Sequence, residues 1–390
     1  MTAVIAQGGG PTAVVNASLF GAVAQLAAAL PESAGIYGAR GGIAGVLEQR
    51  WHDLRRTEAA QWRSIREAPG AALGSCRKRL NPEEAARAVG ILRGLGARYF
   101  FYIGGNDSMD TALKISVAAA AMNFELVVAG IPKTIDNDLL RTDHCPGFGS
   151  AARYIAQSAL DLGADVRGLP PPVSILEVMG RNAGWLAAAT VAARESEDDA
   201  PQLIYVPEVP LGAERFLADV AAACRRRGWV VAAVSEGVRD ETGRSWGERE
   251  GAAADGFGHA LPGGAAAALA GLVTAELGLR ARSEKPGLCG RASALLASHV
   301  DREEAEAVAR FAVSQAVAGH PGFMAAIVRE AGPGYSVHYE RAPLAAVANV
   351  ERRLPPEYLT PEGNGVAGSY RDYVEPLLGG PLRRHARLIP

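Results

Sequence analysis

The sequence predicts an α/β protein of two Rossmann-like lobes, each built on a mostly parallel sheet. Short runs of β-branched or aromatic residues alternate with helical stretches, which is the pattern of repeated βαβ units. Glycine-rich or polar loops follow several of the strands, at the place where parallel sheets bind ligands. The 390 residues are 48% hydrophobic, so the chain can bury two ordinary cores.

The first lobe is predicted from three strands that each end in a distinctive loop. These are the strands at residues 3–6, 99–103 and 126–129, with the loops at 8–12, 104–108 and 130–134. Helical stretches follow the first two loops, at residues 15–30 and 109–122. Because parallel strands bring their carboxyl ends to one edge of a sheet, we expect the three loops to meet there.

The second lobe repeats this arrangement of strand, loop and helix. Its expected elements are a strand at 173–178 ending in the loop 179–181, a helix to about 195, and a strand at 230–234 ending in the loop 235–237. A surface loop is expected at 239–258. A helix at 301–319 and a strand at 323–328 follow later in the chain. We therefore expect one lobe from residues 1–150 plus roughly 291–335. The other is expected from 151–290 plus 336–390, with an active site between them.

The overall composition argues against several classes of partner. Lys and Arg number 40 against 42 Asp and Glu, so no net field favours a nucleic acid or an acidic membrane. The four cysteines lie far apart and are expected to be free thiols. The first residues lack the basic and apolar segments of a signal peptide, and no window has the length of a membrane span. We therefore expect a cytoplasmic protein.

The first glycine-rich loop, at residues 8–12, opens a helix and suits a phosphate. Free amide N–H groups and the helix dipole attract an anion there whatever its parent molecule. The loop also fits the dinucleotide pattern G-x-G-x-x-A, with Glu32 near the distance of a ribose-binding acid, but this pattern alone has low specificity. A tight turn that needs glycine only for its backbone shape is the structural alternative.

The second loop, at residues 104–108, also follows a strand but carries a carboxylate, Asp107. A carboxylate beside a phosphate implies a bridging cation, most simply Mg²⁺ with oxygen ligands. The alternative is that Asp107 or Ser108 caps the following helix.

The third loop, at residues 132–138, is the most specific. Its two carboxylates, Asp136 and Asp138, would point to the same side of an extended chain, and Lys133 precedes them. Phosphoryl transfer needs a base for the acceptor hydroxyl, a carboxylate for magnesium and a cation for the migrating charge. An Asx-turn could explain Asn137 and Asp138 but leaves Lys133 and Asp136 without a role.

These three loops resemble those of the phosphofructokinase family, and more closely its pyrophosphate-dependent branch. Matching segments occur in the family's order and cover the chain to about residue 330. They are Gly-Gly-Gly-Pro-Thr-Ala-Val-Val-Asn at 8–16, Gly74-Ser75-Cys76-Arg77, and residues 104–108, 132–138, 146–151, 179–185 and 235–237. The resemblance implies the phosphofructokinase fold, Mg²⁺ as cofactor, pyrophosphate and fructose 6-phosphate as substrates, a place in glycolysis, and a homodimer or homotetramer.

Carried over position by position, the resemblance also assigns roles to single residues. It implies that Asp136 is the base that deprotonates the sugar's 1-hydroxyl, with Lys133 and Arg77 as its catalytic companions. The implied donor-binding residues are Gly10, Asp107 and Lys133, the metal ligands are Asp107 and Asp138, and the acceptor-binding residues are Thr134, Asp138, Met179, Gly180, Arg181, Glu236, Arg291 and, from a neighbouring subunit, Arg282. The first lobe is then the phosphoryl-donor and magnesium lobe, and the second the sugar-phosphate lobe.

Positions 107 and 133 bear on the choice of donor. ATP-using relatives usually carry glycine at both, which leaves room for the inner phosphate and the adenosine. Here Asp107 would repel and block an α-phosphate, while the ammonium of Lys133 can neutralise a compact diphosphate. Pyrophosphate is the expected donor, and the family implies a reversible reaction.

Three positions depart from the family's pattern. Asn106 stands where many members have a metal-binding aspartate, so magnesium is expected to depend more on Asp107 and Asp138, or to be held through water. Pro172 stands where an arginine often grips the sugar phosphate across subunits. Leu288 replaces a histidine of ATP-type relatives, which leaves the acceptor open, including to sedoheptulose 7-phosphate.

Three other functions remain as alternatives. An ATP-dependent 6-phosphofructokinase conflicts with Asp107 and Lys133. A non-catalytic metabolite-binding subunit is suggested by Asn106 and Pro172 but conflicts with the intact Asp136. A dehydrogenase would rest on the first glycine-rich loop alone.

Overall fold

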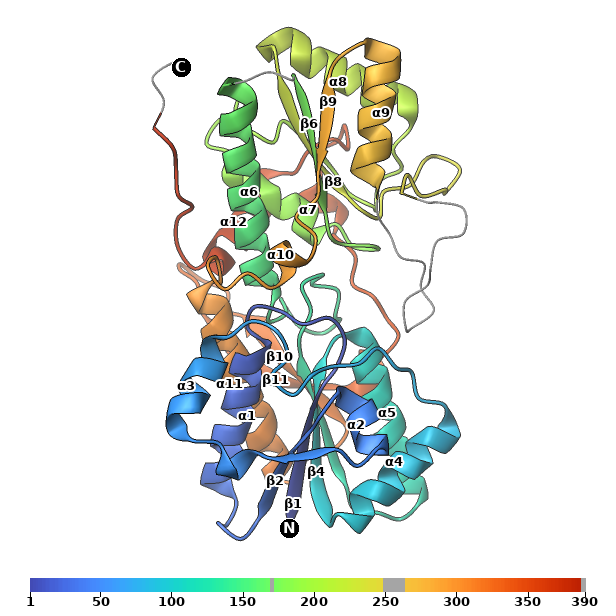
Figure 1. The fold of residues 1–390 in the computed structure, drawn as a ribbon, viewed down its shortest axis with the longest axis vertical. Helices are drawn as coiled ribbons and strands as arrows, with labels where there is room; N and C mark the ends of the chain where they lie inside the picture. The colour runs from blue at the N-terminus through green and yellow to red at the C-terminus, as the bar shows by residue number, and fades with distance from the viewer. Residues whose placement is uncertain (169–171, 248–263, 387–390) are drawn as a thin grey trace. The chain divides into compact units, whose positions relative to one another are not determined.

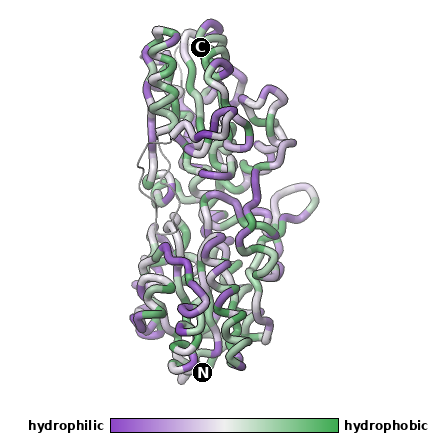
Figure 2. Tube along the Cα trace, turned by 90° about the vertical axis from the view of Figure 1, so that its right-hand side faces the viewer, coloured by the Kyte–Doolittle hydropathy of each residue, from purple (hydrophilic) through white to green (hydrophobic). Residues whose placement is uncertain are grey.

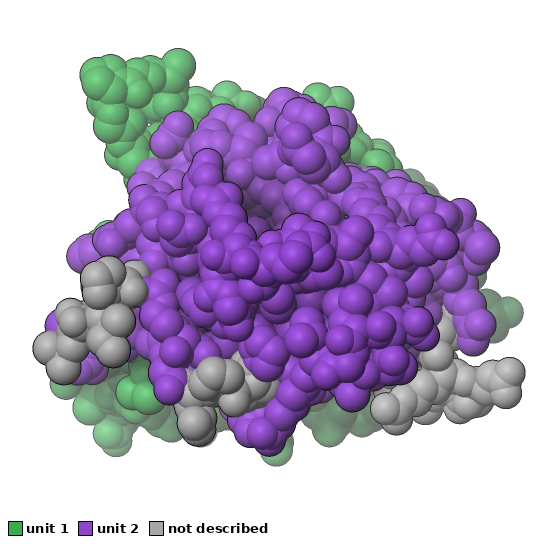
Figure 3. All heavy atoms as spheres, turned by 90° about the horizontal axis from the view of Figure 1, so that it is seen from above, with its two compact units in different colours: residues 1–148, 255–259, 291–352 green, residues 149–254, 260–290, 353–390 purple. Residues whose placement is uncertain are grey.

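The computed structural model describes residues 1–168, 172–247 and 264–386, which belong to two compact units (Figures 1 and 3). Among these residues, unit 1 comprises 1–148 and 291–352. Unit 2 comprises 149–168, 172–247, 264–290 and 353–386. Along the tube of Figure 2, hydrophobic and hydrophilic stretches alternate in both units, as expected of buried strands connected by helices that expose one side.

Unit 1 contains a seven-stranded sheet in the order β11-β10-β5-β4-β1-β2-β3. The strands are β1 Thr2–Gln7, β2 Gly35–Ala39, β3 Trp51–Asp53, β4 Ala97–Gly104, β5 Val127–Pro132, β10 Phe323–Arg329 and β11 Val337–Pro343. The five inner strands run parallel, whereas β3 and β11 are antiparallel edge strands. The carboxyl ends of β1, β4 and β5 therefore lie side by side.

Helices cover both faces of this sheet (Figure 1). They are α1 Val15–Ala29, α2 Gly42–Leu47, α3 Ala59–Glu67, α4 Pro82–Gly94, α5 Asn106–Ala121 and α11 His299–Val317, with short 3-10 turns at η1 Leu54–Arg56 and η3 Leu344–Ala346. Some begin with clear capping signals. Asn81 and Glu84 form a reciprocal capping box at α4, and the Ser298 side chain caps α11.

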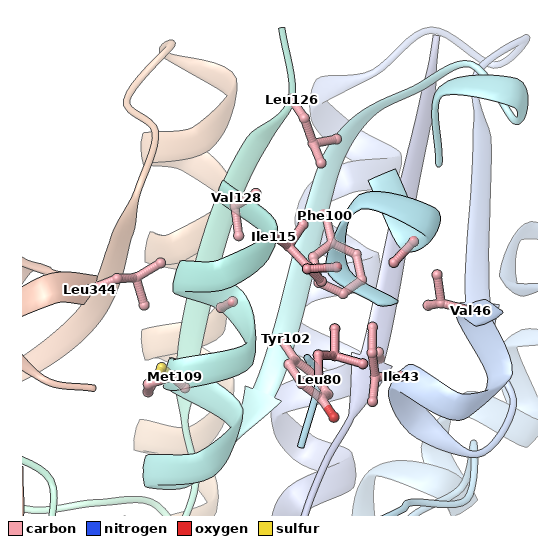
Figure 4. Close-up of a cluster of buried hydrophobic side chains, with 14 of the residues drawn as sticks. Ile43, Val46, Leu80, Phe100, Tyr102, Met109, Ile115, Leu126, Val128 and Leu344 are labelled. Carbon is pink, nitrogen blue, oxygen red and sulfur yellow. The ribbon is translucent and has the colours of Figure 1, made fainter. Parts of the chain in front are cut away.

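The two faces are distinguished by the alternation of side chains along each strand. In β1, Ala3 and Ile5 pack in the cluster that includes α1 and α11, while Val4 and Ala6 pack in the cluster that includes α2, α4 and α5. Figure 4 shows the second cluster, in which Phe100 lies among side chains from neighbouring strands and helices. Strands buried on both faces explain the continuous apolar runs in the sequence.

Several boundaries in unit 1 differ from the expected ones. Helix α5 begins at Asn106 rather than at 109, and β5 continues to Pro132 rather than ending at 129. The unit extends to Arg352, beyond the expected limit near 335. The reason for the last difference is that β11 pairs along its whole length with β10.

Unit 2 contains a four-stranded sheet whose strands are all parallel, in the order β7-β8-β6-β9. The strands are β6 Val173–Val178, β7 Leu203–Tyr205, β8 Val230–Ser235 and β9 Ala281–Glu284. The helices are α6 Phe148–Gly168, α7 Trp185–Ala189, α8 Ala213–Arg227, α9 Ala265–Leu277, α10 Leu288–Arg291 and α12 Gly368–Val374, with 3-10 turns at η2 Thr190–Ala193, η4 Pro356–Tyr358 and η5 Glu375–Leu378. The predicted fold class, two α/β lobes with mostly parallel sheets, is confirmed.

Two expectations for unit 2 need qualification. The helix expected to reach about residue 195 is a short α7 followed by the 3-10 turn η2. Of the expected surface loop at 239–258, residues 248–258 lie outside the described residues. The remaining part forms a tight turn in which the Asp240 carboxylate accepts hydrogen bonds from the backbone N–H groups of Thr242 and Arg244.

All four cysteines are free thiols, as expected from their spacing. Cys145 is buried and Cys289 is exposed. Within the part of the chain that the structure describes, no helix combines the length and the apolar character needed to cross a bilayer.

Candidate active site

The three loops that follow β1, β4 and β5 meet at one edge of the unit 1 sheet, as predicted. The backbone N–H of Gly8 donates to the carbonyl oxygen of Ile103 at 2.8 Å. The N–H of Lys133 donates to the carbonyl oxygen of Gly104 at 3.0 Å. These bonds continue the sheet pairing past the strand ends and hold the loops in contact.

Two helices begin at this edge without a side-chain cap. Helix α1 follows Val14, and α5 follows Gly105; neither residue makes a capping hydrogen bond. The alternative in which Asp107 or Ser108 caps α5 is therefore wrong, because Gly105 holds the N-cap position and Asp107 lies in the first turn. Uncapped first turns present backbone N–H groups and the positive end of the helix dipole to an anion.

Lys133 lies at the centre of this edge and is 3% exposed. Its Nζ donates to the carbonyl oxygen of Gly10 at 2.6 Å, which joins the third loop to the first. Burial, with the nearby charge of Arg291, lowers the pKa of Lys133 to about 8, although Asp136 acts in the opposite direction. Lys133 therefore carries its positive charge at neutral pH but loses it only slightly above, and its neighbours set the pKa at which this happens.

Arg291 and Arg77 add two further cations beside Lys133. A Cβ on Gly10 would lie 2.9 Å from the Arg291 guanidinium, so glycine at this position permits the close approach. Burial, and then the charge of Arg77, lowers the pKa of Arg291. The segment carrying Arg77 is fixed to the first loop, because Ser75 Oγ donates to the Gly9 carbonyl oxygen at 2.6 Å. The expected acceptor residue Arg291 therefore lies with the residues expected to bind the donor.

The two carboxylates of the third loop share this environment. Burial, followed by the charge of Asp136, raises the pKa of Asp138 to about 7. Asp138 Oδ1 is buried and has no hydrogen-bond partner. Between them, Asn137 adopts a left-handed conformation with φ 55°, and its side-chain oxygen accepts from the backbone N–H of Cys145 at 3.0 Å. A local Asx-turn does not explain that bond, which joins the loop to a residue eight positions later in the chain.

Thr134 stands at the start of the same loop. Its backbone N–H donates to the carbonyl oxygen of Pro146 at 3.2 Å, and its hydroxyl oxygen accepts from the N–H of Asp136 at 3.1 Å. The hydroxyl group therefore fixes the backbone of the expected base.

Asp107 forms an ion pair that sequence reasoning missed. Its Oδ1 lies 3.0 Å from Arg79 Nε and 2.9 Å from an Arg79 terminal nitrogen. Arg79 lies two residues after Arg77, in a run of basic residues that carried no motif of its own. Nothing in that run indicated that Arg79 would pair with Asp107.

The described residues contain no group of three or more His, Cys, Asp or Glu side chains arranged to hold a metal ion. Asp138 nevertheless fits a hard cation, because a buried carboxylate oxygen without a partner needs a positive ligand or a proton. Asp107 fits less well, since its carboxylate is engaged by Arg79.

In unit 2, the expected acceptor residues lie on two adjacent strand ends. Val178 and Ser235 are paired, so the loops after β6 and β8 lie side by side. The Gly180 N–H donates to Glu236 Oε1 at 3.4 Å, and Ser235 Oγ donates to the Gly180 carbonyl oxygen. Gly180 has φ 132°, a conformation that favours glycine. Met179 and Arg181 flank it in the same loop.

The structure does not group Arg282 with these residues. It lies exposed on β9, the edge strand of the unit 2 sheet, opposite Ser174 rather than at the strand ends. Its expected contribution to a neighbouring subunit remains a prediction.

Comparisons with known proteins identify a family for this chain. The Phosphofructokinase family model matches residues 2–316. Two proteins named pyrophosphate--fructose 6-phosphate 1-phosphotransferase are similar to this chain: that of Xanthomonas campestris pv. campestris (strain B100) is 42% identical over 96% of this chain and 91% of its own length, and that of Methylococcus capsulatus (strain ATCC 33009 / NCIMB 11132 / Bath) is 39% identical with the same coverage. The crystal structure of a pyrophosphate-dependent phosphofructokinase from Marinobacter aquaeolei has a TM-score of 0.88 at 38% identity, covering 97% of this chain and 92% of that one. The chain belongs to the phosphofructokinase family.

Proposed function

We propose that this protein transfers a phosphoryl group from pyrophosphate to the 1-hydroxyl of fructose 6-phosphate, reversibly and with Mg²⁺. The observation that carries the proposal is the cluster at the carboxyl end of the unit 1 sheet, where the charges of Arg77, Arg291, Asp136 and Asp138 all act on the buried Lys133. The names of the relatives agree with this reaction.

In the proposed reaction, Asp136 accepts the proton of the acceptor's 1-hydroxyl. The alkoxide oxygen attacks the terminal phosphorus of pyrophosphate, the bond from that phosphorus to the bridging oxygen breaks, and orthophosphate leaves. Lys133, Arg77 and the backbone N–H groups at the start of α1 and α5 stabilise the charge on the migrating group. Gly10 lets the donor phosphates approach the backbone.

Asp138 is the residue that fits Mg²⁺ best, through its buried oxygen without a partner. When bound, the ion would neutralise charge on the donor phosphates. The oxygens of the donor itself would supply further ligands. Asp107 would join the ligands only after leaving Arg79.

Asp107 also supports pyrophosphate over ATP. Its carboxylate is paired with Arg79 at the first turn of α5, next to the loop whose Gly104 carbonyl oxygen accepts from the Lys133 N–H. A fixed negative charge disfavours the additional phosphate and nucleoside of ATP, whereas a diphosphate is compact enough to contact the cations alone.

We assign acceptor binding to unit 2 through Met179, Gly180, Arg181 and Glu236. The buried Glu236 carboxylate, 8% exposed, is a hydrogen-bond acceptor for a sugar hydroxyl. The proposed oligomer, a homodimer or homotetramer, would add Arg282 from a second copy. Cytoplasmic location stays a prediction.

A panel of donors against acceptors tests the proposal. The purified chain with Mg²⁺ is given pyrophosphate or ATP, each with fructose 6-phosphate or sedoheptulose 7-phosphate, and products are followed by phosphorus NMR. We expect turnover with pyrophosphate and fructose 6-phosphate at least 100-fold above turnover with ATP, consistent with about 3 kcal/mol of discrimination. Equal turnover with ATP would favour the ATP-dependent alternative, and substrate binding without turnover the non-catalytic one.

A further inference from the structure

The short segment 349–352, which we call the clasp, is the last part of unit 1 and contacts two of the loops just described. At its first end, the Asn106 side chain makes a reciprocal pair of hydrogen bonds with it. Asn106 Nδ2 donates to the Val350 carbonyl oxygen at 2.6 Å, and Asn106 Oδ1 accepts from the Asn349 N–H at 2.7 Å. Asn349 Nδ2 also donates to Asp110 Oδ1 at 2.8 Å. The clasp is therefore attached to the first turns of α5.

At its other end, the clasp holds the loop of the two carboxylates. Leu139 and Glu351 form an antiparallel bridge, and the Arg352 backbone N–H donates to the Asp138 carbonyl oxygen at 2.7 Å. The backbone of the clasp is thus paired directly with the backbone that carries Asp138.

The Arg352 guanidinium adds the strongest part of this attachment. Nε and one terminal nitrogen donate to the Asn137 carbonyl oxygen at 3.2 and 3.1 Å. The other terminal nitrogen donates to the carbonyl oxygens of Thr142 and Asp143 at 2.7 and 2.6 Å. The planar fork of an arginine reaches three carbonyl oxygens at once in this way, whereas a lysine ammonium carries its three donors on one nitrogen and cannot reproduce that spread.

The residue held most firmly is the one that separates Asp136 from Asp138. Asn137 has φ 55°, which few residues other than glycine adopt, and Arg352 binds its carbonyl oxygen while Cys145 binds its side chain. Because the left-handed residue sets the direction of the chain on both sides, its stability decides where the two carboxylates point. A displacement of about 1 Å in a reacting group can reduce a rate 100-fold.

We propose that the clasp, through Arg352 and Asn106, positions Asp136 and Asp138 against the first turn of α5, and that Arg352 is a positioning residue for the reaction. The inference rests on the proposed function, since it assigns both loops to one phosphoryl transfer. It also gives Asn106 a role. An aspartate there could not donate to the Val350 carbonyl oxygen, and its carboxylate would repel that oxygen.

The test compares Arg352→Lys with Arg353→Lys, in which the neighbouring, exposed arginine receives the same change. Steady-state rates with pyrophosphate, Mg²⁺ and fructose 6-phosphate are measured for both. We expect Arg352→Lys to lower kcat 10- to 100-fold while both KM values stay within about threefold of wild type, since the Arg352 guanidinium is bonded to backbone carbonyl oxygens. Arg353→Lys should keep the wild-type kcat.

A second variant, Asn106→Asp, removes one hydrogen bond from the other end of the clasp and keeps the inference testable if Arg352→Lys does not fold. It should lower kcat about 10-fold, and the double variant should lose less than the product of the two single losses, because both changes loosen one clasp. The positioning role of the clasp is contradicted if Arg352→Lys has the same kcat as Arg353→Lys, or if Arg352→Lys changes KM rather than kcat. It is also contradicted if Asn106→Asp raises kcat. If the wild-type protein is inactive with pyrophosphate, the proposed function is contradicted instead. The kcat ratios of variant to wild type would then be measured with the donor and acceptor that the panel finds active.

Discussion

The carboxyl-end loops of the two sheets differ in how they use charge. In unit 1 the loop after β5 carries Lys133 and two carboxylates close to Arg77 and Arg291, and burial shifts the pKa values of Lys133, Asp138 and Arg291. In unit 2 the loops after β6 and β8 are arranged mainly through the backbone, with Gly180 bonded to Ser235 and Glu236. Both sets occupy the same position in the α/β pattern.

This difference separates two kinds of chemistry. A migrating phosphoryl group needs charges held in place before the reaction, because its own charge is redistributed in the transition state. A hydroxyl-rich acceptor needs a fixed shape and a few hydrogen-bond partners. We therefore expect changes in unit 1 loops to alter kcat and its pH dependence, and changes in unit 2 loops to alter KM for the acceptor.

The largest effect should come from Asp136→Asn. The amide keeps the shape of the carboxylate but cannot accept the proton of the acceptor hydroxyl. We expect kcat to fall about 10³- to 10⁴-fold, with the binding constant of fructose 6-phosphate, measured by calorimetry, almost unchanged. Full turnover in this variant would show that Asp136 is not the base, and it would contradict the assignment of the chemistry to unit 1.

The next effect concerns pH and Lys133. Its pKa of about 8 lies below the usual value for lysine, so the ammonium loses its proton as the pH rises through 8. We expect kcat/KM for pyrophosphate to fall about 10-fold per pH unit above that value, because the free enzyme then lacks the cation. Profiles from pH 6 to 10 would show this limb.

Lys133→Arg is the matched control, since a guanidinium stays charged throughout the range. Its absolute rate should be lower, because a Cβ at Gly9 would already lie only 3.4 Å from Lys133 Nζ and the space is small. The alkaline limb should nevertheless disappear. A limb that persists unchanged in Lys133→Arg would show that pyrophosphate itself or another group titrates.

The sequence predicted the elements of unit 1 well because local signals and tertiary packing agree there. Apolar runs buried on both faces marked β1, β4 and β5, and the loops after them followed from the parallel order. The boundaries shifted where a polar residue starts a helix. Asn106 begins α5 although its side chain reaches back to Val350, a partner that nothing near it in the sequence reveals.

The missed parts of the candidate site share one property: their partners are far away in the chain. Arg352 binds carbonyl oxygens more than 200 residues earlier, and carbonyls carry no sequence signature. Arg79 pairs with Asp107 across two loops. Sequence patterns identify residues whose type dictates their chemistry, whereas residues that fix a backbone become visible only when the loops are assembled.

The smallest effect on kcat, and the one that sharpens the comparison most, should come from Glu236→Gln in unit 2. The glutamine oxygen can still accept from the Gly180 N–H, which the native carboxylate binds at 3.4 Å, so the loop keeps its shape. Losing one charge-assisted hydrogen bond to the acceptor costs about 1.5–3 kcal/mol, which corresponds to a KM for fructose 6-phosphate about 10- to 100-fold higher. The kcat value should stay within about twofold, because this contact is equally strong in the ground state and the transition state. A fall in kcat as large as the rise in KM would mean that the unit 2 loops also take part in the chemistry.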